Sequence, residues 1–376
     1  MTLEILPCSN KKDLRDFVSF PFELYPLSSP WVGPIIKQDI YLLDSTRHPF
    51  WQTARRELFV AKEFGKTRGR IAAIIDEKYN SFAQEACGAF GFFECVEDEE
   101  VAHALLEVAR SWHLANGMKF LRGPLNPSTN YTCGMLVQGF EYAPALMMPW
   151  NPPSYPKFLS TWPLFKEQDL FAYHIDRSNL SLPAWLAEEV EKLKKESLFT
   201  SRTSSKKTMA EDIHVMLEIY RESWSDNWGF SPLSQGEADA LVKELKQIAE
   251  PEFFLLFFYD KKPAAGMVAL PDINPLLKKL RGKIGASALW HWWRLRPILR
   301  QGYRMILFGI KPEYRLLGLP LLLLDNLLEI ARRHPDLAWV EGSWVLEDNV
   351  AICDLIEDFG GVIRKRYRIY RQDIAP

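Results

Sequence analysis

The chain has 376 residues, a length that fits two domains better than one. Hydrophobic residues make up 47% and charged residues 25%, which is usual for a soluble globular protein. The net charge of −2 gives no electrostatic reason to expect nucleic acid or an anionic membrane as a partner. Neither a secretory leader nor a membrane span is recognisable, and the five cysteines and seven histidines lack metal-ligand spacing. We therefore expect a soluble, cytoplasmic chain with reduced thiols and no metal.

The first half of the chain alternates between predicted strands and helices. A weak helical pattern covers residues 11–25, and apolar runs at 58–61 and 71–75 flank a polar turn, which predicts a hairpin. A strand at 88–93, a helix that begins at the acidic residues 97–100, and a strand at 118–122 follow. Residues 130–137 are predicted as a short helix, 148–156 as a loop and 170–175 as a closing strand.

The second half repeats this order. After helices at 183–196, 209–224 and 235–249, a hairpin is predicted at 253–270, then a strand at 305–310, a helix at 321–333, a strand at 337–344, a helix at 349–358 and a strand at 365–371. Strands alternating with helices predict an α/β fold. The polar, basic residues 196–207 suggest a boundary, so we predict an N-terminal domain at 1–196 and a C-terminal domain at 197–376.

The segment at residues 306–320 is the most informative one. It reads as an apolar strand, a short turn and a helix start, with Pro312, Arg315 and Gly318 in the turn. A turn that ends at a helix N-terminus offers unpaired N–H groups and a positive potential to a phosphate. A glycine lets the backbone approach such a ligand closely.

This segment resembles the pyrophosphate loop of the GNAT acyl-CoA N-acyltransferases, whose pattern is Val-x-Pro-x-x-Arg-x-x-Gly-x-Gly/Ala between a strand and a helix. Ile310, Pro312, Arg315 and Gly318 match it in register. A second match runs from Asn349 to Gly360 and resembles the family's Asn-x-x-Ala…Leu-Gly-Phe segment. Across both halves the chain is similar to uncharacterised bacterial proteins with two tandem GNAT-like domains in a mixed α/β (α+β) sheet.

The resemblance implies acetyl-CoA or a longer acyl-CoA as cosubstrate and an unknown primary amine as acceptor. The residues implied to contact the acyl-CoA are Phe308, Ile310, Arg315, Leu316, Leu317, Gly318, Leu319 and Asn349. Two positions depart from the family pattern. Pro320 stands where Gly or Ala is usual and lacks an N–H, and Ile356 stands where many members have a Tyr general acid. The first half has acidic residues in place of a phosphate loop and is expected to be a degenerate GNAT-like domain.

Acylation of an amine needs a group that accepts the amine proton. Glu341 and Ser343 share one face of a predicted strand, and Glu347 follows at its end. Glu341 and Glu347 are therefore the candidate bases, with a solvated or helix-capping glutamate as the alternative reading of each. The candidate substrate residues are Trp224, Asp226, Asn227, Trp228 and Asn274. Capped helix ends and turns are the alternative reading of these.

Residues 278–304 contain eight Lys or Arg, no Asp or Glu, and the sequence Trp290-His291-Trp292-Trp293. The spacing of Leu289, Trp292, Trp293 and Arg296 favours a helix packed on one side. A membrane surface, an acyl chain or single-stranded nucleic acid is the alternative partner of this stretch. Three functions follow from the sequence: an acyl-CoA-dependent N-acyltransferase, a catalytically inactive GNAT-fold protein that binds a small or acyl-chain ligand, and a peripheral membrane protein. The oligomeric state, the acceptor and the acyl length stay open.

Overall fold

The computed structural model describes residues 3–182, 184–195 and 198–374. The chain forms two compact units, and each is assembled from separate segments. Unit 1 comprises Met1–Leu170, Leu276–Trp293 and Lys365–Pro376, and unit 2 comprises Phe171–Pro275 and Arg294–Arg364. The predicted domain boundary between residues 196 and 197 lies outside the described residues.

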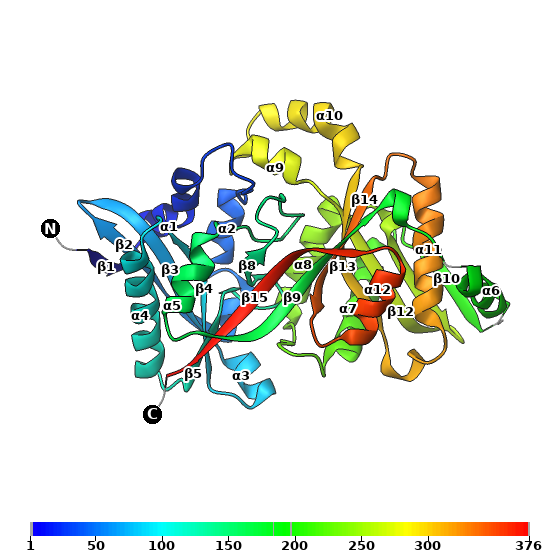
Figure 1. The fold of residues 1–376 in the computed structure, drawn as a ribbon, viewed down its shortest axis with the longest axis horizontal. Coiled ribbons are helices and arrows are strands. Elements are labelled where there is room, and N and C mark those ends of the chain that lie inside the picture. The colour runs from blue at the N-terminus through cyan, green and yellow to red at the C-terminus, as the bar shows by residue number, and fades with distance from the viewer. Residues whose placement is uncertain (1–2, 183, 196–197, 375–376) are drawn as a thin grey trace. The chain divides into compact units, whose positions relative to one another are not determined.

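Unit 1 contains a sheet in the order β1-β2-β3-β4-β5-β15, with β8 also paired to β15 (Figure 1). The neighbours are antiparallel except β4 and β5, which run parallel. The strands are β1 (Glu4–Pro7), β2 (Ala54–Glu63), β3 (Lys66–Asp76), β4 (Cys87–Cys95), β5 (Phe120–Gly123), β8 (Met135–Gln138) and β15 (Val362–Asp373), and a separate pair is β6 (Leu125–Asn126) with β7 (Thr132–Cys133).

The helices of unit 1 begin and end where the sequence provides caps. Asn10 accepts hydrogen bonds from the N–H groups of Lys12 and Asp13, and Asp98 accepts one from Glu100. The helices are α1 (Lys11–Leu24), α2 (Ile36–Leu42), α3 (Glu77–Ala83), α4 (Glu99–Ala115) and α5 (Ser154–Thr161), with η1 (Pro49–Gln52) as a 3-10 turn. Helix α4 buries Leu105 and Leu106 completely in the core beside the sheet, which stabilises the unit by about 1.5–3 kcal/mol for each side chain.

Unit 2, which includes β9 from Phe171 onward, contains the strand order β9-β14-β13-β12-β11-β10. Strands β13 and β14 are parallel, and β10 to β13 are antiparallel to their neighbours. The strands are β9 (Phe165–Asp176), β10 (Phe199–Thr203), β11 (Phe254–Tyr259), β12 (Lys262–Pro271), β13 (Gly302–Ile310) and β14 (Trp339–Leu346). This mixed sheet with helices confirms the predicted α/β class.

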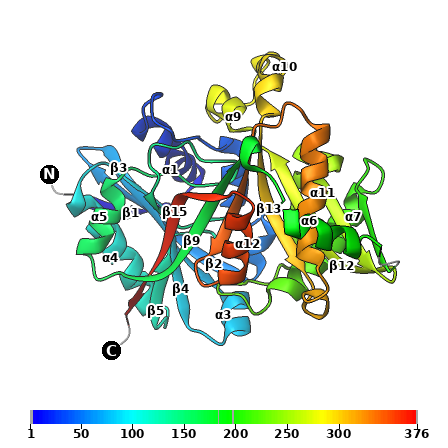
Figure 2. The same ribbon diagram turned by 45° about the vertical axis from the view of Figure 1, so that its right-hand side comes forward.

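Helices cover both faces of the unit 2 sheet. Helix α11 joins the core cluster that contains Leu255, Ala265 and Met267, whereas α7 packs beside Gly266, which points to the other face by the period of two in a strand. The helices are α6 (Ala184–Leu193), α7 (Met209–Trp224), α8 (Gln235–Ile248), α11 (Leu319–Arg333) and α12 (Val350–Asp358), with η2 (Arg177–Asn179), η3 (Pro251–Phe253) and η4 (Pro312–Tyr314) as 3-10 turns. Figures 1 and 2 show α11 in orange, and Figure 2 shows α6 beside it.

Two more helices lie in the stretch where the chain leaves and re-enters unit 2: α9 (Asn274–Leu280) and α10 (Ser287–Leu299). Helix α10 begins in unit 1 and ends in unit 2. The helices that the structure describes are all too short or too polar to cross a bilayer.

The structure differs from the sequence analysis in three places. Residues 130–137 form strands β7 and β8 instead of a helix, because Gly134 has a φ of 86° and the apolar residues after it pair with β15. Residues 199–203, part of the polar, basic segment 196–207 for which no element was predicted, form the edge strand β10 along β11. Leu289, Trp292, Trp293 and Arg296 do lie on a helix, but all four are exposed, so that face does not pack.

Candidate functional site

In unit 2, the parallel strands β13 and β14 pair along only part of their length. The register runs from Gly302 opposite Trp339 to Met305 opposite Gly342, and among the described residues no pairing between these strands continues beyond that point. Residues 307–310 keep β12 as their neighbour on the other side. Because backbone polar groups need partners, the open edge of β13 can pair with the amides of an extended ligand. Phe308 and Ile310, predicted to contact the acyl-CoA, lie on this segment.

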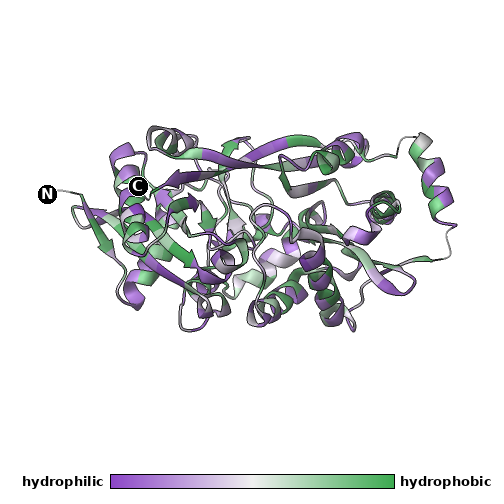
Figure 3. Cartoon of the chain, turned by 90° about the horizontal axis from the view of Figure 1, so that it is seen from below, coloured by the Kyte–Doolittle hydropathy of each residue, from purple (hydrophilic) through white to green (hydrophobic). Residues whose placement is uncertain are grey.

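The loop between β13 and α11 has the predicted strand–turn–helix form. The 3-10 turn Pro312–Tyr314 leads to Arg315, and Gly318 precedes the first residue of α11 with a φ of 77°. A Cβ atom on Gly318 would lie 2.5 Å from Cδ1 of Leu193 on α6. Glycine is therefore required here both for the left-handed backbone and for the close approach of α6. In Figure 3, α6 lies at the right and carries both hydrophilic and hydrophobic residues.

The N–H groups of this loop are only partly used within the chain. Those of Arg315 and Leu317 donate to the carbonyls of Pro312 and Tyr314 at 3.3 and 3.2 Å. Within the described chain, the N–H groups of Leu316, Gly318 and Leu319 donate to no acceptor. The Leu316 side chain is 98% exposed and so does not fill the loop. Three donors thus remain for an anion at the start of α11, although Pro320 adds none.

Two cations of the loop connect it to the end of α7. Lys311 Nζ lies 2.6 Å from Glu218 Oε1 and 3.2 Å from Glu222 Oε2. Burial alone would lower the pKa of Lys311, but the hydrogen bonds to both glutamates outweigh it and raise the pKa. Arg315 Nη2 donates to the carbonyl of Ser223 at 2.8 Å, one residue before α7 ends. Lys311 and Arg315 therefore hold the loop against α7.

The predicted substrate residues Trp224, Asp226, Asn227 and Trp228 lie at this same end of α7. The N–H of Asn227 donates to the carbonyl of Trp224 at 2.9 Å, which closes the turn, and the ring of Trp224 lies 5.3 Å from that of Tyr220. The bond from Arg315 to Ser223 brings this turn next to the loop. Asn274 is buried at the start of α9, where its N–H donates to Asp272 at 3.2 Å. The substrate role of all five stays a prediction.

A buried polar cluster lies where β13 and β14 separate. Ser343 Oγ donates to Glu341 Oε1 at 3.2 Å, so the two residues share a face as the alternation predicted. Arg304 stands opposite Glu341 in the sheet register, and its guanidinium donates to Ser343 Oγ at 2.9 Å and to the Ser343 carbonyl at 3.1 Å. All three residues are at least 95% buried. Glu347 lies beyond the end of β14 and is half-buried.

The sequence did not single out Arg304 or His174 as site residues. His174, on β9, stacks on the ring of Trp339 at 5.4 Å and lies 3.2 Å from Asp176 Oδ1. Burial first and the charge of Arg364 next lower the pKa of His174, which keeps the ring neutral at neutral pH. Arg304 lies on β13 and His174 on β9, and neither strand carries a sequence motif at that position. Only the contacts with neighbouring strands identify these two residues.

Helix α12 begins after Asn349, whose carbonyl accepts hydrogen bonds from the N–H groups of Ile352 and Cys353. Ile356 packs in a small apolar cluster with Tyr173 and Val345. The Tyr173 hydroxyl donates to Glu357 Oε1 at 2.9 Å, and burial raises the pKa of Tyr173. Tyr173 of β9 therefore lies beside Ile356 of α12.

Unit 1 differs from unit 2 after its own parallel strand pair, β4 and β5. Strands β4 and β5 also pair in parallel over only three positions. After β4, however, the N–H of Glu100 at the start of α4 already donates to Asp98 at 3.0 Å, and Glu94 accepts hydrogen bonds from the hydroxyls of Tyr25 and Tyr155. Asp98 therefore already accepts from an N–H group of the first turn of α4.

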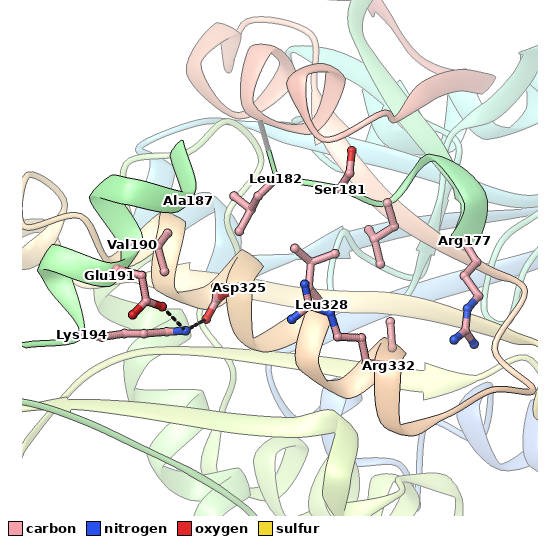
Figure 4. A pocket seen from close by; sticks show the side chains of 12 residues that line it. Arg177, Ser181, Leu182, Ala187, Val190, Glu191, Lys194, Asp325, Leu328 and Arg332 are labelled. Atoms are coloured by element: carbon pink, nitrogen blue, oxygen red, sulfur yellow. Dashed lines mark hydrogen bonds and ion pairs between the residues drawn. The ribbon is translucent and has the colours of Figure 1, made fainter. Parts of the chain in front are cut away.

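A separate cavity of 420 Å³ lies in unit 2 between α6, α11 and residues 177–182 (Figure 4). At one end Lys194 bridges Glu191 and Asp325, with Nζ 2.6 Å from Asp325 Oδ2. Leu182, Val190 and Leu328 contribute apolar surface. None of the residues that the sequence predicted for a site lines this cavity. Among the described residues, no group of three or more His, Cys, Asp or Glu could hold a metal ion.

Comparison with known proteins places this geometry in a family. No protein-family model matches the chain. The chain is 31% identical over 377 residues to Protein YghO of Escherichia coli (97% of this chain and 94% of YghO), and 29% identical over 380 residues to the bacterial ceramide synthase of Caulobacter vibrioides (98% and 97%). A tandem GNAT protein from the clavulanic acid biosynthesis pathway has a similar fold, with a TM-score of 0.57 at 12% identity over 100% of this chain and 99% of that one. The chain therefore belongs to the family of Protein YghO and has the tandem GNAT acyltransferase fold.

Proposed function

We propose that the protein is an acyl-CoA-dependent N-acyltransferase whose acceptor is a primary amine on a long-chain molecule. The observation that carries this proposal is the junction of the open β13 edge with the three unpaired N–H groups at Leu316, Gly318 and Leu319. A strand edge suits the amides of a pantetheine arm, and the amides at a helix start suit a diphosphate. The predicted contacts at Phe308, Ile310, Arg315, Leu317 and Asn349 are part of the same proposal.

The class of acceptor is supported by one relative. The Caulobacter protein is named a ceramide synthase, and a ceramide is the amide of a fatty acid with a long-chain amino alcohol. It is similar to this chain over 98% of the length, so both halves are shared. We propose a long-chain amino alcohol of this kind as the acceptor and a fatty acyl-CoA as the donor.

In the proposed reaction the amine nitrogen attacks the thioester carbonyl carbon. A C–N bond forms, the C–S bond breaks, the amine gives up one proton, and the CoA sulfur leaves as a thiol after it takes up a proton. We assign the proton that the amine gives up to Glu341, to which it would pass through Ser343 or a water molecule. Glu341 and Ser343 both lie where β13 and β14 separate. Glu347, half-buried just beyond the end of β14, is the second candidate. Arg304 would act as a positioning residue because it holds Ser343.

The proposal is tested by the release of free CoA thiol from acyl-CoA in the presence of a long-chain amino alcohol. We expect amine-dependent release by the wild-type chain. Glu341→Gln should lower kcat by about 10²-fold or more while acyl-CoA binding and the unfolding midpoint are retained. Glu347→Gln is the matched comparison and should have a smaller effect. Equal loss in both variants, or none in either, would remove Glu341 from the mechanism.

A second function is favoured by two residues. Ile356 occupies the general-acid position with an apolar side chain, and Pro320 removes one phosphate donor. A catalytically inactive protein that binds a small or acyl-chain ligand would have this pattern. It predicts acyl-CoA or lipid binding without any release of thiol across a panel of amines, whereas measurable turnover would exclude it.

A further inference from the structure

The strongest feature outside the proposed site is the exposed surface of helix α10 and of the turn before it. Leu289, Trp292 and Trp293 lie at positions i, i+3 and i+4 of the helix and therefore share one face. Their exposed fractions are 77%, 45% and 73%, and Ile284 in the preceding turn is exposed too. Of the side chains of α10, only Leu299 is buried. We call the set Ile284, Leu289, Trp292 and Trp293 the α10 face.

Cations border the α10 face on both sides along the chain. The exposed ones are Lys279, Arg281, Lys283, Arg294, Arg296 and Arg300. Residues 278–304 contain no Asp or Glu, whereas the chain as a whole has a net charge of −2. The positive charge is therefore local, and it surrounds the exposed indoles.

The segment before α10 is fixed on unit 1. Lys278 Nζ donates to the carbonyl of Ser29 at 2.7 Å, and the N–H of Ile36 donates to the carbonyl of Gly282 at 2.9 Å. Gly282 has a φ of 76°, and a Cβ there would lie 2.6 Å from the ring of Phe22. These contacts fix the start of the segment to α1, to α2 and to the loop between them, and so hold in place the segment that carries the exposed apolar residues.

We propose that the α10 face docks on the surface of a bilayer that contains anionic phospholipids. Indole rings partition to the boundary between headgroups and acyl chains, because they combine an apolar body with a polar N–H. Lysine and arginine beside them are attracted to anionic headgroups. A second copy of the chain fits this surface less well, because two α10 faces would bring positive segments together. The inference does not depend on the acyl-transfer reaction.

Vesicle flotation with the full chain tests the proposal. We expect binding to phosphatidylcholine vesicles that contain phosphatidylglycerol, weaker binding to phosphatidylcholine alone, and loss of binding as salt rises. Lys283→Gln and Arg296→Gln should each weaken binding by about fivefold. Trp292→Ser with Trp293→Ser should weaken it by about tenfold or more. Phe64→Ser, which removes an exposed aromatic ring from the β2–β3 turn, is the control and should bind like the wild type.

The outcomes separate the docking surface from its alternatives. Each variant is checked by its unfolding midpoint, which should not move, because the substituted side chains are exposed. Quenching of tryptophan fluorescence by brominated lipid should decrease in the Trp292/Trp293 variant. Failure to bind anionic vesicles at low salt would overturn the proposal. So would a loss of self-association in the tryptophan variants without any vesicle binding, since the partner would then be a second copy.

Discussion

At the residue scale, Glu94 in unit 1 makes the stability of the protein depend on pH. Burial raises its pKa from 4.5 to about 7, against the opposing effects of Arg70 and of the hydroxyls of Tyr25 and Tyr155. A carboxyl whose pKa is higher in the folded state stabilises the fold when protonated. This contribution is complete below about pH 4.5 and is lost as pH rises through about 7.

We therefore predict that Glu94→Gln flattens the fall in unfolding midpoint between pH 5 and 7. The amide imitates the protonated carboxyl, and the difference in unfolding free energy should grow to about 3 kcal/mol across this range. Asp39, whose pKa burial raises to about 6, acts in the same direction and remains in both proteins, so the comparison isolates Glu94. Glu100→Gln, at an exposed position of α4, is the control. Identical pH profiles for the wild type and Glu94→Gln would contradict this account.

At the element scale, the paired stretch of β13 and β14 depends on how closely the two strands approach at its first pair. Gly302 stands opposite Trp339, and a Cβ at this position would lie 2.0 Å from Cζ2 of the indole. Gly302→Ala must displace the ring or the strand, which costs about 1–3 kcal/mol of unfolding free energy. Gly285→Ala is the control because nothing lies within 4 Å of its Cβ position. Chemical denaturation should show a lower midpoint for Gly302→Ala alone; equal midpoints would mean that β14 adjusts freely.

The elements also show what the sequence can and cannot predict. Helical periodicity was sufficient for α4, α7 and α11, since each buries one face locally, and acidic residues in the first turn were a further signal for α4. Residues 135–138 have a short apolar run that suits either a helix or a strand. Their pairing with β15 about 230 residues later makes them a strand, and no local pattern contains that partner. Strand β10 was missed because its mostly exposed residues lie at a sheet edge and carry no apolar alternation.

The same limit applies to the site. The register of Pro312, Arg315 and Gly318 predicted the turn into α11, because backbone requirements such as a left-handed glycine are local. Other contacts depend on packing between strands and helices that are distant in the sequence. Arg315 donates to the end of α7, and Arg304 donates to Ser343, only because of such packing. Exposure of the α10 face is likewise a tertiary property, and the amphipathic spacing alone favoured the wrong alternative.

At the scale of the whole molecule, two units of related plan differ at the helix that follows the fourth strand. Helix α4 of unit 1 has its first turn capped by Asp98, whereas α11 of unit 2 follows a loop with three unused N–H groups in the described chain. We therefore predict one acyl-CoA for each chain and not two. The relatives from Escherichia coli and Caulobacter match this chain over 97% and 98% of its length, so the similarity includes both units.

Calorimetric titration of the full chain with acyl-CoAs of increasing length tests the central claim most directly. The loop at Leu316 is exposed and lies outside the core, so substitutions there should leave the fold intact. We predict a single site, with affinity lowered about tenfold by Leu316→Asp, because a negative charge beside the diphosphate costs about 1.4 kcal/mol, and unchanged by the neutral control Leu316→Gln. No binding of any acyl-CoA to folded protein, or equal affinity in the Asp and Gln variants, would contradict the assignment of this loop.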